Sequence, residues 1–296
     1  MGKHHEHASS SNNLKIAFFL NLAFTIIEIV GGFFVNSIAI ISDAFHDLGD
    51  SFSLGMAWYL DIRAKKHPDK SFSYGYYRLS LLGALINSLV LISGSTYVIY
   101  EAIGRFFDPQ YSNANGMILF AILGIAVNGF AAWKLRGGKS LNEQVISWHL
   151  LEDVLGWVAV LIVASILHFW NTPYLDPALS LAITLYILWG VFGRLKETLF
   201  IFLQGVPKEI DLKALEQELL EIPNVQSIHE TRAWSLDGER HIITTHLKLG
   251  PIQSPQQITE VKEAARKILK HYHFSDFTIE TELIDESHHP GLADSQ

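Results

Sequence analysis

The chain has 296 residues, of which 49% are hydrophobic and 18% are charged, with a formal net charge of −8 at pH 7. Soluble proteins carry about 25% charged residues, so a single soluble domain is excluded, and without a basic face nucleic-acid binding is disfavoured. The absence of cysteine excludes disulfides, thiolate metal ligands and cysteine nucleophiles. Residues 1–206 hold 27 charged side chains and residues 207–296 hold 25, which predicts a membrane domain followed by a soluble acidic domain.

Six apolar segments follow one another in the first part, each close to the roughly 20 residues that cross a bilayer as a helix. They are expected at 16–35, 37–60, 79–100, 115–134, 145–169 and 178–203. Their continuous apolar runs lack the alternation of barrel strands, so helix is the expected spanning element. The first segment is too long for a cleavable signal peptide and contains Asn21 and Glu28.

Basic residues in the connections predict the orientation. The connections 61–78 and 135–144 carry seven Lys or Arg residues, whereas those on the opposite side carry only Arg105. With six spans, this places both termini in the cytoplasm. The short termini and loops fit a bacterial inner membrane, and no organellar targeting segment is visible.

The soluble part begins after the junction Gly205-Val206-Pro207. Its pattern predicts a helix near 208–221, strands near 225–234 and 240–249, a helix near 255–271 and a strand near 276–284. The order αββαβ indicates a small α+β domain with a three-stranded sheet. The expected domains are a disordered His-rich N-terminus (1–13), a six-helix transmembrane domain (14–206), a cytoplasmic domain (207–286) and a flexible tail (287–296).

The second span contains four ionisable residues at membrane depth, Asp43, His46, Asp47 and Asp50. Each costs roughly 2.5–3.5 kcal/mol on insertion scales, so the group requires a compensating purpose. Helical steps of 100° place all four within an arc of about 100°. We therefore expect one polar stripe that faces the interior of the helix bundle.

The fifth span repeats the arrangement with His149 and Asp153, four residues apart, and Glu152 between them. The second and fifth spans run in opposite directions, so their polar stripes can face each other. Two imidazoles and two carboxylates form a suitable tetrahedral set for Zn²⁺, with Cd²⁺ and Co²⁺ as neighbouring choices; an oxygen-only set would suit Mn²⁺. A single residue of this kind could instead anchor two helices by a hydrogen bond, and that is the expected role of the lone polar residues Asn21, Glu28, Asn87 and Asn128.

These residues resemble motifs of the cation diffusion facilitator family, within its zinc-transporting branch. Ser42-Asp43-Ala44-Phe45-His46 with Asp50 resembles its S/A-D-A-x-H-x-x-x-D motif, and His149 with Asp153 resembles its H-x-x-x-D. Three further stretches are similar to family patterns: Tyr74-Gly75-Tyr76-Tyr77-Arg78, Asp176-Pro177 with Ser180-Leu181, and Leu203-Gln204-Gly205-Val206-Pro207. The resemblance covers about residues 14–285.

The resemblance implies a membrane transporter that exports Zn²⁺ from the cytoplasm in exchange for protons. It also implies a homodimer, surrounded by membrane lipids, with a cytoplasmic ferredoxin-like domain. The transport site would consist of His46, Asp50, His149 and Asp153. Asp43 matches an acidic position of the motif that is not a direct ligand.

Two residues depart from the family pattern, because Asp47 and Glu152 stand where uncharged residues are more common. They are candidate proton carriers, part of a metal-access route, or partners of polar residues elsewhere; side chains in a solvated cavity are the favoured interpretation. The first cytoplasmic loop offers His67 and Asp69 among three lysines, a poor metal site.

A second metal site is expected in the soluble domain. By resemblance, His229, His246 and Glu282 would form a regulatory Zn²⁺ site at a dimer contact; the alternative is that these are surface histidines of a sheet. His241 and His246 are five residues apart on one strand, so they point to opposite faces. The clusters His4-His5-Glu6-His7 and His288-His289 are expected to be loose zinc collectors in disordered ends.

Three classes of function compete for this pattern. A membrane metalloenzyme would need an open coordination position, which four protein ligands do not leave, so we do not expect an enzyme. A metal sensor or a channel without proton coupling remains the alternative to an exchanger. No phosphate-binding loop is present, so neither a nucleotide partner nor a self-contained ATP-driven pump is expected.

Overall fold

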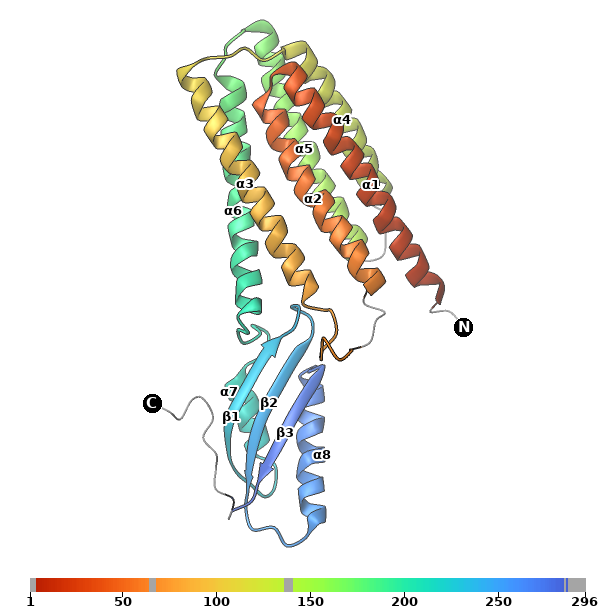
Figure 1. Ribbon diagram of the computed structural model, residues 1–296, viewed down its shortest axis with the longest axis vertical. Helices are drawn as coiled ribbons and strands as arrows, with labels where there is room; N and C mark the ends of the chain where they lie inside the picture. The colour runs from red at the N-terminus through yellow and green to blue at the C-terminus, as the bar shows by residue number, and fades with distance from the viewer. Residues whose placement is uncertain (1–3, 64–67, 136–140, 285, 287–296) are drawn as a thin grey trace. The chain divides into compact units, whose positions relative to one another are not determined.

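The computed structural model describes residues 4–63, 68–135, 141–284 and 286. The chain divides into two compact units (Figure 1). The first, which we call the helical unit, comprises residues 1–67 and 82–195, and the second, the sheet unit, comprises residues 68–81 and 196–296. The expected tail at 287–296 lies outside the described residues.

The helical unit is built from six long helices. They are α1 (His4–Val35), α2 (Ile38–Arg63), α3 (Leu79–Phe107), α4 (Ala114–Leu135), α5 (Leu141–Phe169) and α6 (Leu175–Phe202). All of these except α2 are long and apolar enough to cross a membrane. The 26 residues of α2 make about 39 Å of helix, but three aspartates fall within its apolar stretch. The predicted helical membrane fold is confirmed, with one polar helix among apolar ones.

The start of α1 differs from the expectation. The sequence predicts a disordered segment over residues 1–13, but α1 begins at His4. Residues 4–30 contain neither proline nor glycine, and extending an existing helix costs far less than nucleating one. The helix of the first span therefore continues toward the N-terminus.

Close packing of α4 against α5 fixes the position of the polar segment of α5 along the helix axis. A Cβ atom on Gly124 of α4 would lie 2.3 Å from the ring of Trp157, so only glycine permits this approach. Trp157 is fully buried and also meets the ring of Phe24 of α1, 6.2 Å away. Because Trp157 follows Asp153 by one helical turn, this packing positions the Asp153 carboxylate.

A buried network of hydrogen bonds and an ion pair around Asp176 joins α2, α3 and α6 at one end of these helices. Asp176, at the start of α6, is 1% exposed and accepts hydrogen bonds from Ser37 Oγ (2.6 Å) and the Ile38 N–H (2.8 Å) at the start of α2. Arg105 at the end of α3 lies 3.9 Å from the same carboxylate and donates to the carbonyl and side-chain oxygens of Asn36, each at 2.7 Å. This network ties α2, α3 and α6 together.

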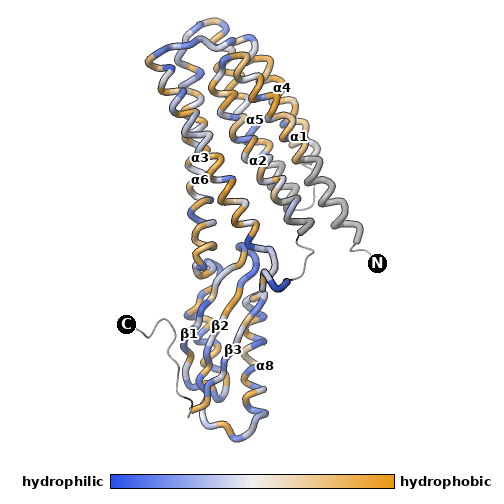
Figure 2. The backbone as a smooth tube through the Cα atoms, in the orientation of Figure 1, coloured by the Kyte–Doolittle hydropathy of each residue, from blue (hydrophilic) through white to orange (hydrophobic). Residues whose placement is uncertain are grey.

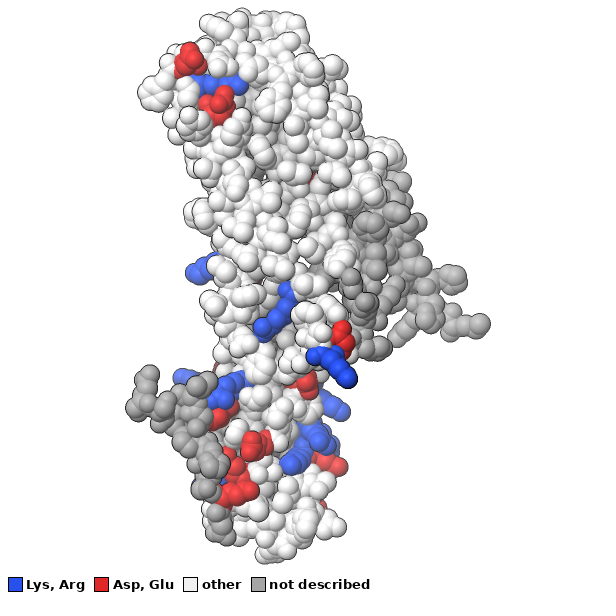
Figure 3. Space-filling model, in the orientation of Figure 1, with Lys and Arg blue, Asp and Glu red and all other residues white. Residues whose placement is uncertain are grey.

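The outward surface of these helices is strongly apolar. Many of their largest side chains are exposed, among them Phe34, Tyr100, Phe130, Trp133 and Trp189. Figure 2 shows apolar colour along much of the coloured part of these helices, and on the face drawn in Figure 3 few charged side chains lie on the helices. Contiguous apolar surface of this extent suits lipid acyl chains rather than water.

The sheet unit has the predicted order αββαβ. Its elements are α7 (Leu212–Leu220), β1 (Val225–Ser235), β2 (His241–Leu249), α8 (Pro255–His271) and β3 (Asp276–Glu282). β1 and β2 pair antiparallel, and β3 pairs parallel to β2 after the crossover through α8. The predicted α+β fold is confirmed. α7 is shorter than expected because Asp211 caps it, accepting hydrogen bonds from the backbone N–H groups of Lys213 and Ala214.

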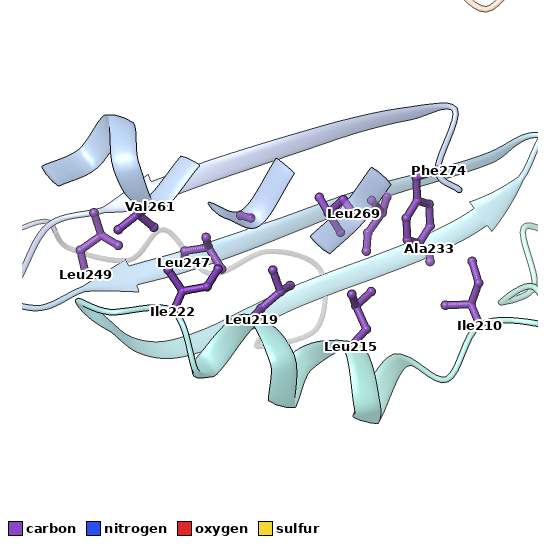
Figure 4. Close-up of a cluster of buried hydrophobic side chains, with 12 residues drawn as sticks. Ile210, Leu215, Leu219, Ile222, Ala233, Leu247, Leu249, Val261, Leu269 and Phe274 are labelled. Carbon is purple, nitrogen blue, oxygen red and sulfur yellow. The ribbon is translucent and has the colours of Figure 1, made fainter. Parts of the chain in front are cut away.

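One hydrophobic core holds α7 and α8 against the sheet (Figure 4). The two helices contribute Leu215, Leu219, Val261, Ala265 and Leu269, which meet strand residues such as Ile243 and Leu247. Nearby, the hydroxyl of Tyr272 donates to Glu218 at 2.8 Å, and this bond raises the pKa of Tyr272 above its ordinary value. The sheet unit thus has a core of its own.

β1 is an irregular strand at one edge of the sheet. Its pairing with β2 shifts register between Val225 and Ser227 and again between His229 and Arg232. At the second shift Glu230 adopts a positive φ of 51°, as bulged residues often do. His229 remains directly opposite His246 of β2.

Candidate metal centres

The polar stripes of α2 and α5 bring four candidate ligands together. Nε2 of His149 lies 2.7 Å from Oδ2 of Asp50, across the two helices. Nε2 of His46 lies 3.5 Å from Asp50 Oδ2 and 4.0 Å from Asp153 Oδ1. His149 Nε2 is also 4.0 Å from Asp153 Oδ2. The structure therefore places all four residues of the predicted transport site in one cluster.

The spacing of three of these donors suits a tetrahedral ion. With bonds of about 2.0–2.1 Å to a central Zn²⁺, donor atoms sit roughly 3.4 Å apart, and the distances here run from 2.7 to 4.0 Å. One ligand atom each of His46, His149 and Asp153 lie within 4.8 Å of one another. The two imidazole rings are 5.7 Å apart and inclined at 71°. Asp50 lies outside this group of three, although its Oδ2 is 2.7 Å from His149 Nε2.

The three predicted relay residues have different surroundings. Asp43 and Asp47 are buried, at 7% and 4% exposure, whereas Glu152 is exposed. Asp43 lies against α5, because a Cβ atom on Gly156 would be 3.9 Å from its Oδ1. The two aspartates thus lie inside the bundle beside the candidate ligands, and Glu152 does not.

The lone polar residues of the spans divide into two groups. Asn21 donates to the carbonyl of Asp47 and to Ser51 Oγ, each at 3.0 Å, and Asn87 donates to Ser53 Oγ at 2.8 Å. These bonds join neighbouring helices, as expected for structural anchors. Glu28 differs, because it is fully buried and neither carboxyl oxygen has a hydrogen-bond donor among the described residues.

The sequence interpretation missed the distinct position of Glu28. Asn21, Thr25 and Glu28 occur at i, i+4 and i+7, the spacing of one helix face. Asn21 of that face contacts α2, so the same face brings Glu28 toward the acidic stripe of α2. The periodicity of α1 was the signal that could have revealed it.

A second cluster forms on the sheet from the three residues predicted there. Oε1 of Glu282 on β3 lies 3.0 Å from His229 Nε2 and 2.9 Å from His246 Nδ1. The two imidazole rings, on paired positions of β1 and β2, are 5.4 Å apart. His246 Nε2 faces Glu280 Oε2 at 3.6 Å, so Nδ1 is the ring nitrogen that is directed at Glu282. His241 instead lines a separate cleft with His271 and His273.

The loop before α3 uses Asp69 for its own structure. Asp69 Oδ1 accepts the backbone N–H groups of Ser71 and Phe72, and Oδ2 accepts the Tyr76 hydroxyl at 2.7 Å. The ring of Tyr77 then lies under the guanidinium of Arg240, with 3.8 Å to the centroid. Both oxygens of Asp69 are thus engaged, and His67 lies outside the described residues.

Comparison with known proteins decides the family. The cation efflux transmembrane domain matches residues 14–203, and the cation efflux protein cytoplasmic domain matches residues 207–283. The chain belongs to the cation efflux family. Its members are the cation diffusion facilitators that the motifs resemble, and they are transporters rather than enzymes.

Several relatives of the cation efflux family match almost end to end. "Zinc transporter ZitB" of Pectobacterium atrosepticum is 31% identical over 100% of this chain and 97% of its own length. "Cadmium, cobalt and zinc/H(+)-K(+) antiporter" of Bacillus velezensis is 34% identical over 90% and 87%. "Metal cation efflux system protein CzcD" of Cupriavidus metallidurans is 33% identical over 96% and 91%. The protein is therefore a multi-pass membrane protein of a family that transports zinc, cadmium and cobalt.

Proposed function

We propose that the protein exports Zn²⁺ from the cytoplasm in exchange for protons, through a tetrahedral site of His46, Asp50, His149 and Asp153. The observation that carries this proposal is the convergence of the four side chains from α2 and α5, with His–Asp pairs of donor atoms 2.7–4.0 Å apart. Two half-buried histidines and two aspartates in apolar helices are costly unless they bind a cation. The names of the relatives support zinc as the cargo.

The ligand set argues for zinc and its chemical neighbours. Two imidazoles favour Zn²⁺, Co²⁺ and Cd²⁺ over oxygen-preferring ions, and the relatives' names include all three metals. Two carboxylates neutralise the charge of one divalent ion, so the loaded site is neutral overall. Without a thiolate, the site releases zinc more readily than a cysteine site would.

Proton exchange follows from the chemistry of the same ligands. Imidazole and carboxylate bind metal only when deprotonated, so Zn²⁺ and protons compete for one site. A protein that alternates between two accesses then couples the two fluxes. Asp43 and Asp47, buried beside the cluster, and the exposed Glu152 serve as a proton relay or metal-access route. The name of the Bacillus relative, which includes H⁺, supports this part of the proposal.

The proposed membrane orientation and dimer rest on the charges of the loops and on the match to the cytoplasmic domain of cation efflux proteins. Both termini and the sheet unit lie in the cytoplasm of a bacterial inner membrane, because the basic connections flank them. Two copies associate as a homodimer, with the sheet unit contributing to the contact. The midplane position of the site in a lipid bilayer gives the ion a path through the helical unit.

Zinc uptake into inverted proteoliposomes tests the exchange. With the cytoplasmic face outward and an acidic lumen, the purified protein should accumulate Zn²⁺ above the external concentration. Collapsing the proton gradient with an ionophore should stop the accumulation. Transport that only equilibrates zinc would establish a channel instead, and saturable zinc binding without any flux would establish a sensor.

We further propose that His229, His246 and Glu282 bind a regulatory Zn²⁺ in the sheet unit. Replacing both histidines with alanine should remove about one zinc ion from the isolated domain, because two of three protein ligands are lost. Equilibrium dialysis with metal analysis measures the change. Replacing the exposed His271 and His273 instead is the matched control, and an unchanged zinc count in the first variant would contradict the proposal.

A further inference from the structure

The start of α2 is closed on every side, whereas the candidate ligands further along are not. The residues from Ser37 to Ala44 are all buried, but the side chains of His149 and Asp50 are 36% and 23% exposed. These two are the members of the cluster that lie nearer to the basic connections. The cluster is therefore accessible from the side of the basic connections and closed toward the start of α2.

On the closed side, a row of buried hydroxyl groups lies between α2 and α6. Ser42, one turn before His46, shares a hydrogen bond of 2.8 Å with Thr184 of α6, and both side chains are buried. One turn further toward the start of α6 lies Ser180, which is fully buried, and one turn beyond it lies Asp176. The rise from Thr184 to Asp176 is about 12 Å. This hydroxyl row (Ser42, Thr184 and Ser180) thus connects the cluster with the start of α6.

Ser180 distinguishes the hydroxyl row from an ordinary contact between helices. Hydroxyl groups often join membrane helices by hydrogen bonds, as those of Ser42 and Thr184 do. The Ser180 hydroxyl has no hydrogen-bond partner among the described residues, although it is buried. A buried polar group without a protein partner is normally satisfied by water. The hydroxyl row is therefore suited to hold water or a hydrated ion, and not only to join two helices.

The chemistry of the hydroxyl row suits an ion in transit. The flanking segments, Ser37–Ser42 of α2 and Pro177–Gly193 of α6, contain no acidic, basic or histidine residue. Hydroxyl oxygens are weaker ligands for Zn²⁺ than imidazole, and conduction requires sites that release the ion as readily as they accept it. With neither strong ligands nor repelling cations in these segments, a divalent ion can pass without being trapped.

We propose that the ion leaves the metal site between α2 and α6, along the hydroxyl groups of Ser42, Thr184 and Ser180. In the present structure the hydrogen bond between Ser42 and Thr184 closes this route, and we call it the outer gate. Separation of the two side chains opens the route when the metal site turns to the outside. This inference rests on the proposed export and assigns the outward half of the ion's path.

A single cysteine tests the route, because the chain has no cysteine of its own. In right-side-out membrane vesicles that are loaded with Zn²⁺ and energised by a proton gradient, Ser180→Cys should react with a membrane-impermeant methanethiosulfonate reagent added outside. A thiol reacts as the thiolate, which forms where water reaches it. The attached group should then stop zinc export by blocking the route.

Ser88→Cys is the matched control for this reaction. Ser88 is also buried, but it lies on α3 and its hydroxyl donates to the Ala84 carbonyl of its own helix at 2.9 Å. Its thiol should not react from outside, and zinc export should continue. Should Ser180→Cys fail to fold, Thr184→Cys places the thiol on the next turn of the hydroxyl row and replaces it in the test.

The outer gate is tested by two further changes in the Ser180→Cys background. Thr184→Val keeps the shape of the side chain but removes the hydroxyl, and should raise the reaction rate about fivefold, the effect of one ordinary hydrogen bond on an equilibrium. Thr184→Ser loses the methyl group but keeps the hydroxyl, so the rate should stay as it was. A role in packing alone would give the opposite order.

The outcomes separate this inference from the proposed function. Thiols at Ser180 and Thr184 that stay unreactive in vesicles exporting zinc, or a modification that leaves export unchanged, would overturn the route. A reaction rate that Thr184→Val does not raise would overturn the outer gate. Wild-type vesicles that export no zinc would instead contradict the proposed export itself.

Discussion

Replacing Asp153 with asparagine is expected to abolish zinc transport while leaving the protein folded. Asparagine keeps the size of the side chain but removes the charge that helps neutralise Zn²⁺. Substituting residues that only orient zinc ligands costs about 10–100-fold in affinity or activity, so loss of a direct ligand should exceed about 100-fold. The initial rate of zinc uptake into proteoliposomes measures this, and Asp50→Asn should behave alike because Asp50 lies 2.7 Å from His149.

Zinc binding measured in detergent distinguishes the loss of a zinc ligand from a general loss of function. Both variants should lose the transmembrane zinc ion and retain the one bound by the sheet unit. Asp108→Asn, an exposed aspartate just after α3, should transport at the wild-type rate. Uptake that survives in both Asp153→Asn and Asp50→Asn would mean that the polar stripes of α2 and α5 are structural.

Replacing Asp176 with alanine should give the largest loss of stability in the helical unit. The carboxylate accepts hydrogen bonds from Ser37, Ile38 and Ser112 and lies beside Arg105. Its removal leaves the first turn of α2 without its acceptor and takes away the carboxylate beside the buried guanidinium of Arg105, and breaking a buried ion pair typically costs about 3–5 kcal/mol. For a unit of this size the apparent Tm should fall by roughly 10 °C, as followed by tryptophan fluorescence in detergent.

Two other substitutions at this end of the helices serve as comparisons for Asp176→Ala. Asp108→Asn removes an exposed charge near Arg105 in the sequence and should shift the Tm by less than about 2 °C, as surface substitutions usually do. Ser112→Ala removes one of the hydrogen bonds to Asp176 and should fall between the two. A Tm for Asp176→Ala close to that of the wild type would show that the network contributes little to holding α2, α3 and α6 together.

The sequence predicted which candidate ligands lie close together, by helical spacing in one cluster and by family resemblance in the other. Four-residue spacing put His149 and Asp153 on one face of a helix, and the structure pairs His229 with His246 across two strands. Periodicity within one helix says nothing about contacts between helices, however. The closest pair of the first cluster, His149 and Asp50, joins two spans, and only the packing of α2 against α5 reveals it.

Other features depend on competing interactions that a sequence pattern does not show. The start of α1 at His4 reflects cheap helix extension, whereas the polar residues there suggested a linker. Asp69 was a candidate ligand by type, but the backbone N–H groups of its own loop take one of its oxygens. Glu28 looked like an isolated anchor because its acidic neighbours come from other helices.

The irregular edge of the sheet has a consequence for aggregation. A regular edge strand presents evenly spaced N–H and C=O groups on which a strand of another molecule can assemble. The two register shifts of β1 and the positive φ of Glu230 break that spacing, and β3 on the other side is short and carries Asp276, Glu280 and Glu282. Neither edge is therefore a good template for β-sheet extension between molecules.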